Sequence, residues 1–436
     1  MSGSSPGADT PRIHTLGNGV RVVCDPVPGA RTTALVVAAG RGARWEDTRQ
    51  SGWSHFLEHM VFKGAAGRSA RQLAEAIEAG GGQMNAETGF ERTVFHVRTL
   101  PEGLDGASAL LSDILLRPTL DPVDLDRERR VVLQEIAEAE DTPDDLVFEM
   151  AQAAAFEGQS LGRCILGDAE SLARADAAAL SGWRRWLYAP DRLVVTVSGA
   201  VDEEALLKLA ERDFAAAEPS DGAPPPAARF TAGVRTDDRS LEQANLVFLC
   251  PGLAATDPDA WAAQVYVECL GGGTASRLFQ EAREERGLAY AVDAWGEFWS
   301  DSGLVGVFAG CEAGDASELA RLAVEQMADL AASPREAELA RARAQLKAGQ
   351  FMAAESLLTR AEQAASQVLV HERLVPPGEI AERIDACDAE AVRRAGGRLL
   401  GAGLAAAAVL GPGAAHSAAE TFRSGVLSMA TATGKS

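Results

Sequence analysis

The sequence predicts an α+β protein made of two similar domains, in which helices flank β-sheets. Its length of 436 residues is large for a single core and favours two domains of about 200 residues each. Short strand-like runs alternate with helical patterns along the chain. After a stretch rich in Pro, Ala and Gly at 215–230, similar elements recur in a similar order, which indicates a duplicated α+β domain.

The first half, residues 1–214, begins with apolar runs typical of strands and continues with helices. We expect the first helix to end at Gly64, because glycine commonly stops a helix. Ser69 is a suitable N-cap for the next helix, which a run of glycines ends. An Asp-Pro pair opens a long acidic helix. The expected elements are strands 20–27, 32–40, 91–100 and 191–201 and helices 51–64, 69–82, 103–116 and 121–140.

Residues 215–230 contain little that could be buried, so we interpret them as a linker between domain 1–214 and domain 231–436. The longest uncharged apolar run, 399–415, is too short for a membrane span and is broken by Gly-Pro. We interpret it as a helix end followed by a buried strand. The expected elements of the second half are strands 245–253, 302–310 and 404–412, helix 261–273 and a long helical region at 315–395.

The charge balance and the cysteines exclude several classes of function. The chain has 41 Lys and Arg against 63 Asp and Glu, a net charge of -22, so we expect no non-specific binding of nucleic acid. The acidity serves solubility or, alternatively, attracts basic ligands. Six scattered cysteines without a CxxC pair indicate buried thiols. The first twenty residues lack a basic start and an apolar core, so we expect a cytoplasmic protein with no membrane segment.

The stretch GWSHFLEHMVFKG at 52–64 predicts a metal site. His55 and His59 are four residues apart, so on a helix both imidazoles lie on one face and can bind one zinc ion. Glu58 lies beside them and can take a proton from water whose pKa zinc lowers to roughly 7. A catalytic zinc needs a third protein ligand from elsewhere. Candidates on helix 121–140 are Glu128, Glu135, Glu138 and Glu140.

Spacing alone does not choose among these carboxylates. Glu128 and Glu135 are two helical turns apart and share a face, so one could bind the metal while the other orients a histidine. The alternative is that the acidic helix is an ordinary solvated face and that the histidines have a structural role. Only six histidines occur in the chain, and a pair at this spacing around a glutamate favours the metal site.

Several stretches, in order and spacing, resemble the pitrilysin and mitochondrial-processing-peptidase family of zinc proteases. Residues 55–59 match the HxxEH signature of the inverzincins. The resemblance implies two homologous α/β domains, each a mostly antiparallel sheet flanked by helices, together forming half of a clam-shaped peptidase. The stretches that carry it are 52–64, 80–95, 127–145, 161–172, 188–202 and 270–292.

The resemblance also implies roles for the candidate residues. One Zn²⁺ per chain would be held by His55, His59 and Glu135. Glu128 would contact one of the zinc ligands without binding the metal itself, and Glu58 would act as the general base.

Four further residues match positions that contact the substrate in the family. Asn85 and Ala86 would line a cleft in which the substrate peptide pairs with a strand edge. Arg283 and Tyr290 match a pair that contacts the substrate backbone or the carbonyl under attack, as donors to a developing oxyanion would.

The expected function is therefore that of a zinc-dependent endopeptidase acting on peptides or unfolded segments. One chain carries both the zinc motif and the Arg283/Tyr290 pair, which is what a homodimer needs; a heterodimer with a related subunit is the alternative. The competing interpretation of the function is a non-catalytic structural or assembly subunit of the same fold.

Overall fold

The computed structural model describes residues 10–220 and 222–433. The chain forms two compact units, and each takes segments from both halves of the sequence. The first contains Met1–Ile136, Cys164–Pro225 and Phe351–Val375; the second contains Ala137–Arg163, Pro226–Gln350 and Pro376–Ser436. The expected boundary at 215–230 divides the sequence into two continuous halves. Each compact unit, in contrast, also contains a segment from the other half. Residues 1–9, 221 and 434–436 of the expected domains and linker lie outside the described part.

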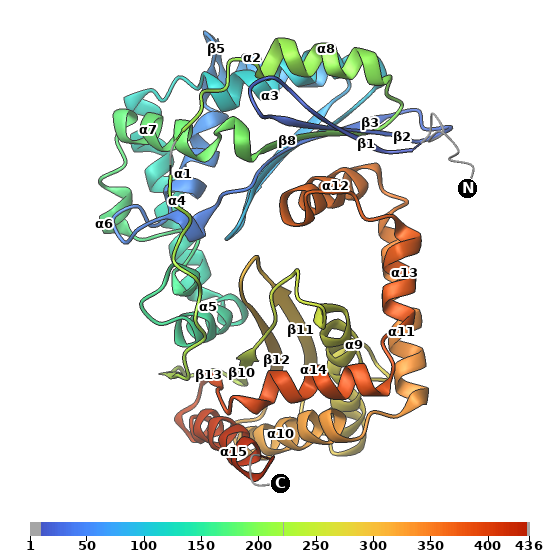
Figure 1. Ribbon diagram of the computed structural model, residues 1–436. Helices are drawn as coiled ribbons and strands as arrows, with labels where there is room; N and C mark the ends of the chain where they lie inside the picture. Colours follow the sequence, from blue (N-terminus) through green and yellow to red (C-terminus); the bar gives the residue numbers. More distant parts are fainter. Residues whose placement is uncertain (1–9, 221, 434–436) are drawn as a thin grey trace, which may run out of the picture. The chain divides into compact units, whose positions relative to one another are not determined.

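The first unit is built on a sheet with strand order β1-β2-β8-β3-β7-β6, in which β2 and β8 are parallel and all other neighbours are antiparallel (Figure 1). Its strands are β1 (Arg12–Thr15), β2 (Arg21–Pro26), β3 (Thr33–Ala39), β6 (Gln83–Thr88), β7 (Thr93–Thr99) and β8 (Leu193–Gly199), with β4 (Gly64–Ala65) and β5 (Arg68–Ser69) as a separate hairpin. Its helices are α1 (Trp53–Val61), α2 (Ala70–Ala79), α3 (Leu104–Leu116), α4 (Pro122–Asp141), α6 (Ala169–Leu172), α7 (Ala177–Leu187), α8 (Glu203–Phe214) and α12 (Leu357–His371).

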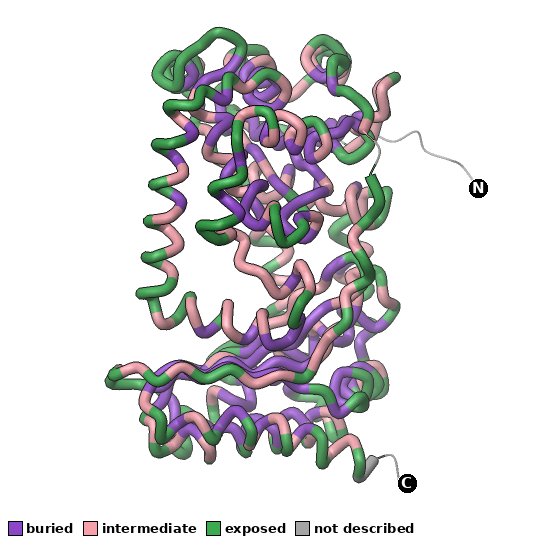
Figure 2. The backbone as a smooth tube through the Cα atoms, turned by 90° about the vertical axis from the view of Figure 1, so that its left-hand side faces the viewer, coloured by how far each residue is buried: buried purple, intermediate pink, exposed green. Residues whose placement is uncertain are grey.

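Both faces of this sheet are covered by helices. Helices α3 and α8 pack on one face and α12, which comes from the second half of the sequence, packs on the other (Figure 1). Every residue of β3 is therefore buried, which is why this strand reads as a continuous apolar run without alternation. Burial is concentrated in the sheets and in the helix faces turned toward them (Figure 2).

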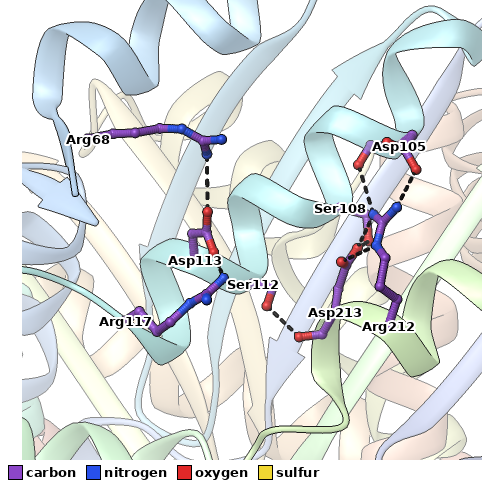
Figure 3. A network of polar contacts seen from close by, with 8 residues as sticks. All are labelled: Arg68, Asp105, Ser108, Ser112, Asp113, Arg117, Arg212 and Asp213. Carbon is purple, nitrogen blue, oxygen red and sulfur yellow. Dashed lines mark hydrogen bonds and ion pairs between the residues drawn. The ribbon is translucent and has the colours of Figure 1, made fainter. Parts of the chain in front are cut away.

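Polar contacts hold α3 to its neighbours (Figure 3). Asp113 of α3 is paired with Arg68 of β5 and with Arg117. At the other side of the helix, the Ser108 hydroxyl donates to Asp213 Oδ2 of α8 at 2.6 Å. Asp113 is buried, so its two arginine partners compensate a charge that would otherwise be costly to bury.

The second unit is built on a sheet with strand order β11-β12-β10-β13-β9, antiparallel except between β13 and β9. Helix α5 packs on one face, while α9, α14 and α15 pack on the other. Its strands are β9 (Val234–Asp238), β10 (Ala244–Pro251), β11 (Ala291–Phe298), β12 (Gly303–Cys311) and β13 (Ala406–Gly411). Its helices are α5 (Pro143–Ala155), α9 (Ala260–Gly271), the π-helical turn η5 (Phe279–Glu285), α10 (Ala316–Ala332), α11 (Glu336–Ala353), α13 (Pro377–Asp385), α14 (Ala389–Gly401) and α15 (Ser417–Thr433).

The expected α+β fold with two mostly antiparallel sheets flanked by helices is confirmed. Two of the differences from the expected boundaries have a clear physical reason. Helix α1 ends at Val61, before Gly64, because Gly64 has a φ of +152° and begins the β4–β5 hairpin. The long helical region 315–395 is divided into α10 to α14, with Pro334 and Pro376 at two of the breaks. Within 10–220 and 222–433, no helix has the length and apolar character needed to cross a membrane.

Candidate functional site

The N-terminal end of α1 is held by a buried carboxylate. Glu46 accepts hydrogen bonds from the backbone N–H groups of Gly52 at 2.8 Å and Ser54 at 2.6 Å. These are donors that a helix leaves unsatisfied at its start, and a negative charge is favourable there. Gly52 has a φ of +83°, and a Cβ on it would lie 2.4 Å from the carbonyl oxygen of Leu166, so only glycine fits. The direction of α1 is therefore fixed before its histidines begin.

His55 and His59 lie on the same face of α1, as their spacing predicts, with ring centroids 4.7 Å apart. Helix α4 presents Glu135 to them: Glu135 Oε2 lies 3.9 Å from Nε2 of His55 and 3.5 Å from Nε2 of His59. Ligand atoms of a tetrahedral zinc ion lie roughly 3.4 Å apart, because each is about 2.1 Å from the metal. The three residues offer ligand atoms that all lie within 4.8 Å of one another.

The row of residues on α4 explains why Glu135 faces α1. Leu125, Glu128 and Val132 are buried at helical spacing, and Glu135 continues the same row. The side chain of Arg129 lies over the ring of Phe56 of α1, 5.7 Å from its centroid. The packing of α4 against α1 thus brings together residues from two distant parts of the sequence.

Two atoms of this group are buried without a hydrogen-bond partner, Nδ1 of His55 and Oε2 of Glu135. A buried carboxylate oxygen with no partner is costly, and a bound cation would satisfy it. Burial and the neighbouring His59 lower the pKa of His55 to about 4, so its imidazole is neutral at physiological pH, the form that binds metals. Two imidazoles and one carboxylate fit zinc.

Glu128, which the sequence suggested as a support for a histidine, is buried beside His59. Its Oε2 lies 3.3 Å from Nδ1 of His59, and its Oε1 lies 2.9 Å from Nζ of Lys63. A carboxylate on the Nδ1 side of a histidine fixes the ring and leaves Nε2 free for a metal.

Glu58, the candidate base, receives a hydrogen bond from the hydroxyl of Thr88 at the end of β6. Burial raises the pKa of Glu58, and the Thr88 hydrogen bond opposes this rise. The carboxylate is close enough to His59 and Glu135 for their charges to affect its pKa. A half-buried carboxylate held beside a metal-ligand group can accept and return a proton.

Asn85 and Ala86 lie on β6, one of the two edge strands of the first sheet. Asn85 pairs with His96 and Ala86 with Phe95 of β7, and the opposite edge of β6 pairs with no other strand among the described residues. An extended peptide can add to such an edge.

Arg283 and Tyr290 belong to the second unit and are both exposed. Arg283 lies in η5, with its guanidinium over the ring of Phe279 at 4.9 Å. The Tyr290 hydroxyl donates to Glu312 Oε1 at 3.1 Å, and 54% of this residue is exposed.

Sequence reasoning missed the contacts of Glu46, Lys63 and Thr88 with this group. Lys63 and Thr88 lie inside stretches that carry the family resemblance, but their partners lie on other elements. Glu46 precedes the motif in a segment that forms no long helix or strand, so no periodic pattern marks it.

Comparisons with known proteins identify the family of the chain. A family model described as insulinase, peptidase family M16, matches residues 21–169, and one described as the peptidase M16 inactive domain matches residues 174–346. An uncharacterized zinc protease of Rickettsia felis is 30% identical over 401 residues, covering 92% of this chain and 97% of the relative. The uncharacterized zinc protease YmxG of Bacillus subtilis is 36% identical over 320 residues, covering 73% and 78%.

A probable mitochondrial-processing peptidase subunit beta of Arabidopsis thaliana is 32% identical over 398 residues, covering 88% of this chain and 75% of the relative. Two solved structures share the fold. A protease from Helicobacter pylori has a TM-score of 0.85 at 19% identity, covering 93% of this chain and 100% of that one. A peptidase M16 inactive domain from Pseudomonas fluorescens has a TM-score of 0.86 at 20% identity, covering 92% and 98%. The chain therefore belongs to the insulinase family of peptidases, family M16, whose relatives include the zinc proteases named above.

Proposed function

We propose that this chain is a zinc-dependent endopeptidase that hydrolyses peptides or unfolded polypeptide segments in the cytoplasm. The observation that carries the proposal is the group of His55, His59 and Glu135, with the buried oxygen of Glu135 unpartnered and Glu58 held beside it. A purely structural zinc site would use four protein ligands and would have no role for a carboxylate next to the metal.

In this function His55, His59 and Glu135 would hold one Zn²⁺. Zinc, when bound, lowers the pKa of a coordinated water to roughly 7 and polarises the peptide carbonyl. Glu58 accepts the proton of the attacking water and then returns it to the leaving nitrogen. Thr88 orients Glu58 by donating a hydrogen bond to one carboxylate oxygen, which leaves the other oxygen available for the proton.

The substrate would bind as an extended chain along the edge of β6, beside Asn85 and Ala86. Main-chain hydrogen bonds to a strand edge give affinity with little demand on sequence, which suits a peptidase for unfolded segments. Asn85 has an exposed side chain that can contact the substrate, and Ala86 is half-buried.

We propose a homodimer in which the partner subunit's Arg283 and the partner subunit's Tyr290 act on the substrate. The support is that both side chains are exposed on the second unit and carry donors suited to a developing oxyanion. A heterodimer with a related subunit is the alternative assembly.

A second candidate function, a non-catalytic subunit of the same fold, is favoured by one observation. The model matching residues 174–346 is described as an inactive domain. The metal-ligand group and Glu58, however, lie outside this range, within residues 21–169. An active first half and an inactive second half fit the endopeptidase as well.

The test of the function is cleavage of a quenched peptide library by the purified chain, with and without a chelator, beside Glu58→Gln. We expect cleavage by the wild type only, with zinc retained by Glu58→Gln. A wild type that retains zinc but cleaves no peptide would favour the non-catalytic function.

The test of the assembly is a mixture of two inactive variants, Glu58→Gln and the double variant Arg283→Ala, Tyr290→Phe. In a homodimer that shares its site, mixing restores activity, because one of the two sites is then intact. No recovery after confirmed subunit exchange would contradict the shared site.

A further inference from the structure

Glu128 contacts both His59 and Lys63, and so links Lys63 to the metal-ligand group. Glu128 touches His59 Nδ1 with one oxygen, 3.3 Å away, and Lys63 Nζ with the other, 2.9 Å away. Lys63 follows α1 by two residues, so it reaches a carboxylate on α4 from beyond the end of the helix that carries the histidines.

The backbone around Lys63 is fixed on both sides. Its N–H donates to the carbonyl of Met60 at 3.1 Å, which extends the last turn of α1. Gly64 accepts a hydrogen bond from the N–H of Thr119 at 2.8 Å, and a Cβ on Gly64 would lie 3.0 Å from the carbonyl oxygen of Arg68. The start of the Lys63 side chain therefore has a defined position relative to α1.

The charges explain what the ammonium of Lys63 contributes. Glu128 is only 4% exposed, and a buried carboxylate is destabilising unless it is paired and hydrogen-bonded. Its other partner, His59, must be neutral to bind a metal, so it supplies no compensating charge. Lys63 supplies a positive charge to this carboxylate.

We propose that Lys63 is a positioning residue for His59: its ammonium fixes the carboxylate of Glu128, and this carboxylate fixes the imidazole so that Nε2 faces Glu135. The inference rests on the zinc site of the proposed function and adds a residue to it. Partners that orient a metal-binding histidine typically change metal affinity by about 10- to 100-fold.

The experiment measures zinc affinity of the purified full-length chain by competition with a chromogenic chelator. We expect Lys63→Met to weaken zinc binding by about 10- to 100-fold. Lys63→Arg keeps a cation and should restore most of the affinity. The matched control is Lys208→Met, which removes a 75% exposed lysine paired with Glu204 on α8 and should leave the affinity unchanged.

A double-mutant cycle tests whether the effect passes through Glu128. In a Glu128→Gln background, Lys63→Met should change zinc affinity by less than about twofold, because the group it orients is already altered. Equal effects of Lys63→Met in both backgrounds would overturn the proposal. So would a zinc affinity of Lys63→Met equal to that of the wild type.

Thermal unfolding of the zinc-free proteins separates positioning from folding. We expect zinc-free Lys63→Met to remain folded but to unfold at a lower temperature than zinc-free Lys208→Met, because buried Glu128 loses its cation, and to show a smaller increase on adding zinc. If both Lys63→Met and Lys63→Gln fail to fold while Lys63→Arg folds, Lys63 is a structural anchor and the proposal is overturned. These readouts require no cleavage, so a wild type that binds zinc without peptidase activity would contradict the proposed function alone.

Discussion

The hydroxyl of Thr88 donates a hydrogen bond to Oε2 of Glu58, which links the end of β6 to the middle of α1. The strand edge that would receive the substrate and the carboxylate that would move the proton are thus joined by one contact. A change in the position of β6 would therefore change the position of the Glu58 carboxylate.

Thr88→Val removes this hydrogen bond while keeping the shape of the side chain. A hydrogen bond to a charged group contributes about 1.5–3 kcal/mol, so we expect kcat to fall by roughly 10- to 100-fold with KM and zinc content unchanged. Steady-state kinetics on a fluorogenic peptide would measure this, with Thr15→Val, at an exposed threonine of β1, as the control. Unchanged kcat would show that Thr88 does not orient Glu58.

Glu135→Gln should abolish stable zinc binding, because it removes the charged ligand and leaves two imidazoles. Glu138→Gln is the matched control, since Glu138 lies on the same helix but is exposed. Metal analysis after gel filtration would show zinc in the control and in the wild type. Zinc retained by Glu135→Gln would mean that another carboxylate is the third ligand.

Glu46→Ala should destabilise α1 by about 0.5–2 kcal/mol, the usual effect of losing a side chain that caps a helix. Because α1 carries both histidines, we also expect weaker zinc binding. Chemical denaturation with and without zinc measures both effects. A loss of stability with undiminished zinc affinity would indicate that the relative position of the His55 and His59 imidazoles does not depend on the cap from Glu46.

The second unit should lose stability in acid through Glu338. Burial alone would raise the pKa of Glu338, but hydrogen bonds from Arg277 and from the backbone of Arg335 outweigh it, so its pKa is lowered below 4.5. A carboxylate with a lowered pKa in the folded state stabilises the fold above its unfolded pKa. This contribution is lost as pH falls from about 4.5 through the folded value.

Arg277→Met should lower the stability of the same unit by about 3–5 kcal/mol at neutral pH, because it leaves the buried Glu338 without its cation. The acid dependence assigned to Glu338 should shrink in this variant. Urea titrations at several pH values would measure both. The same acid slope in wild type and variant would assign that slope to other carboxylates.

Local features of the site were predictable from the sequence, and distant ones were not. The common face of His55 and His59 follows from helical spacing alone. Spacing left Glu128, Glu135, Glu138 and Glu140 open; the family resemblance pointed to Glu135, and the packing of α4 on α1 brings it to the histidines. Glu46 caps α1 through a tertiary contact that leaves no periodic pattern in the sequence, so the sequence did not predict it.

In the fold, too, local features were predictable and distant ones were not. The central strands were found because they are long apolar runs, whereas edge strands β1, β6, β9 and β11 are short or half-exposed and were not among the expected strands. Helix α12 has an apolar row that indicates a buried face, consisting of Ala361, Ala364, Ala365 and Val368. Such a row does not tell which sheet it covers, and it covers the sheet formed by the other half of the chain.

That exchange has a consequence for synthesis on the ribosome. The first sheet is complete in sequence once β8 has emerged, yet its second face stays open to water until α12 is made. The carboxylate of Asp25, which is buried in the folded chain, likewise gains its arginine partner only after Arg360 has been synthesised. The guanidinium of Arg360 donates two hydrogen bonds to it, of 2.9 and 2.7 Å. During this interval the nascent chain exposes Val23, Val36 and Val194, a surface that a chaperone could shield.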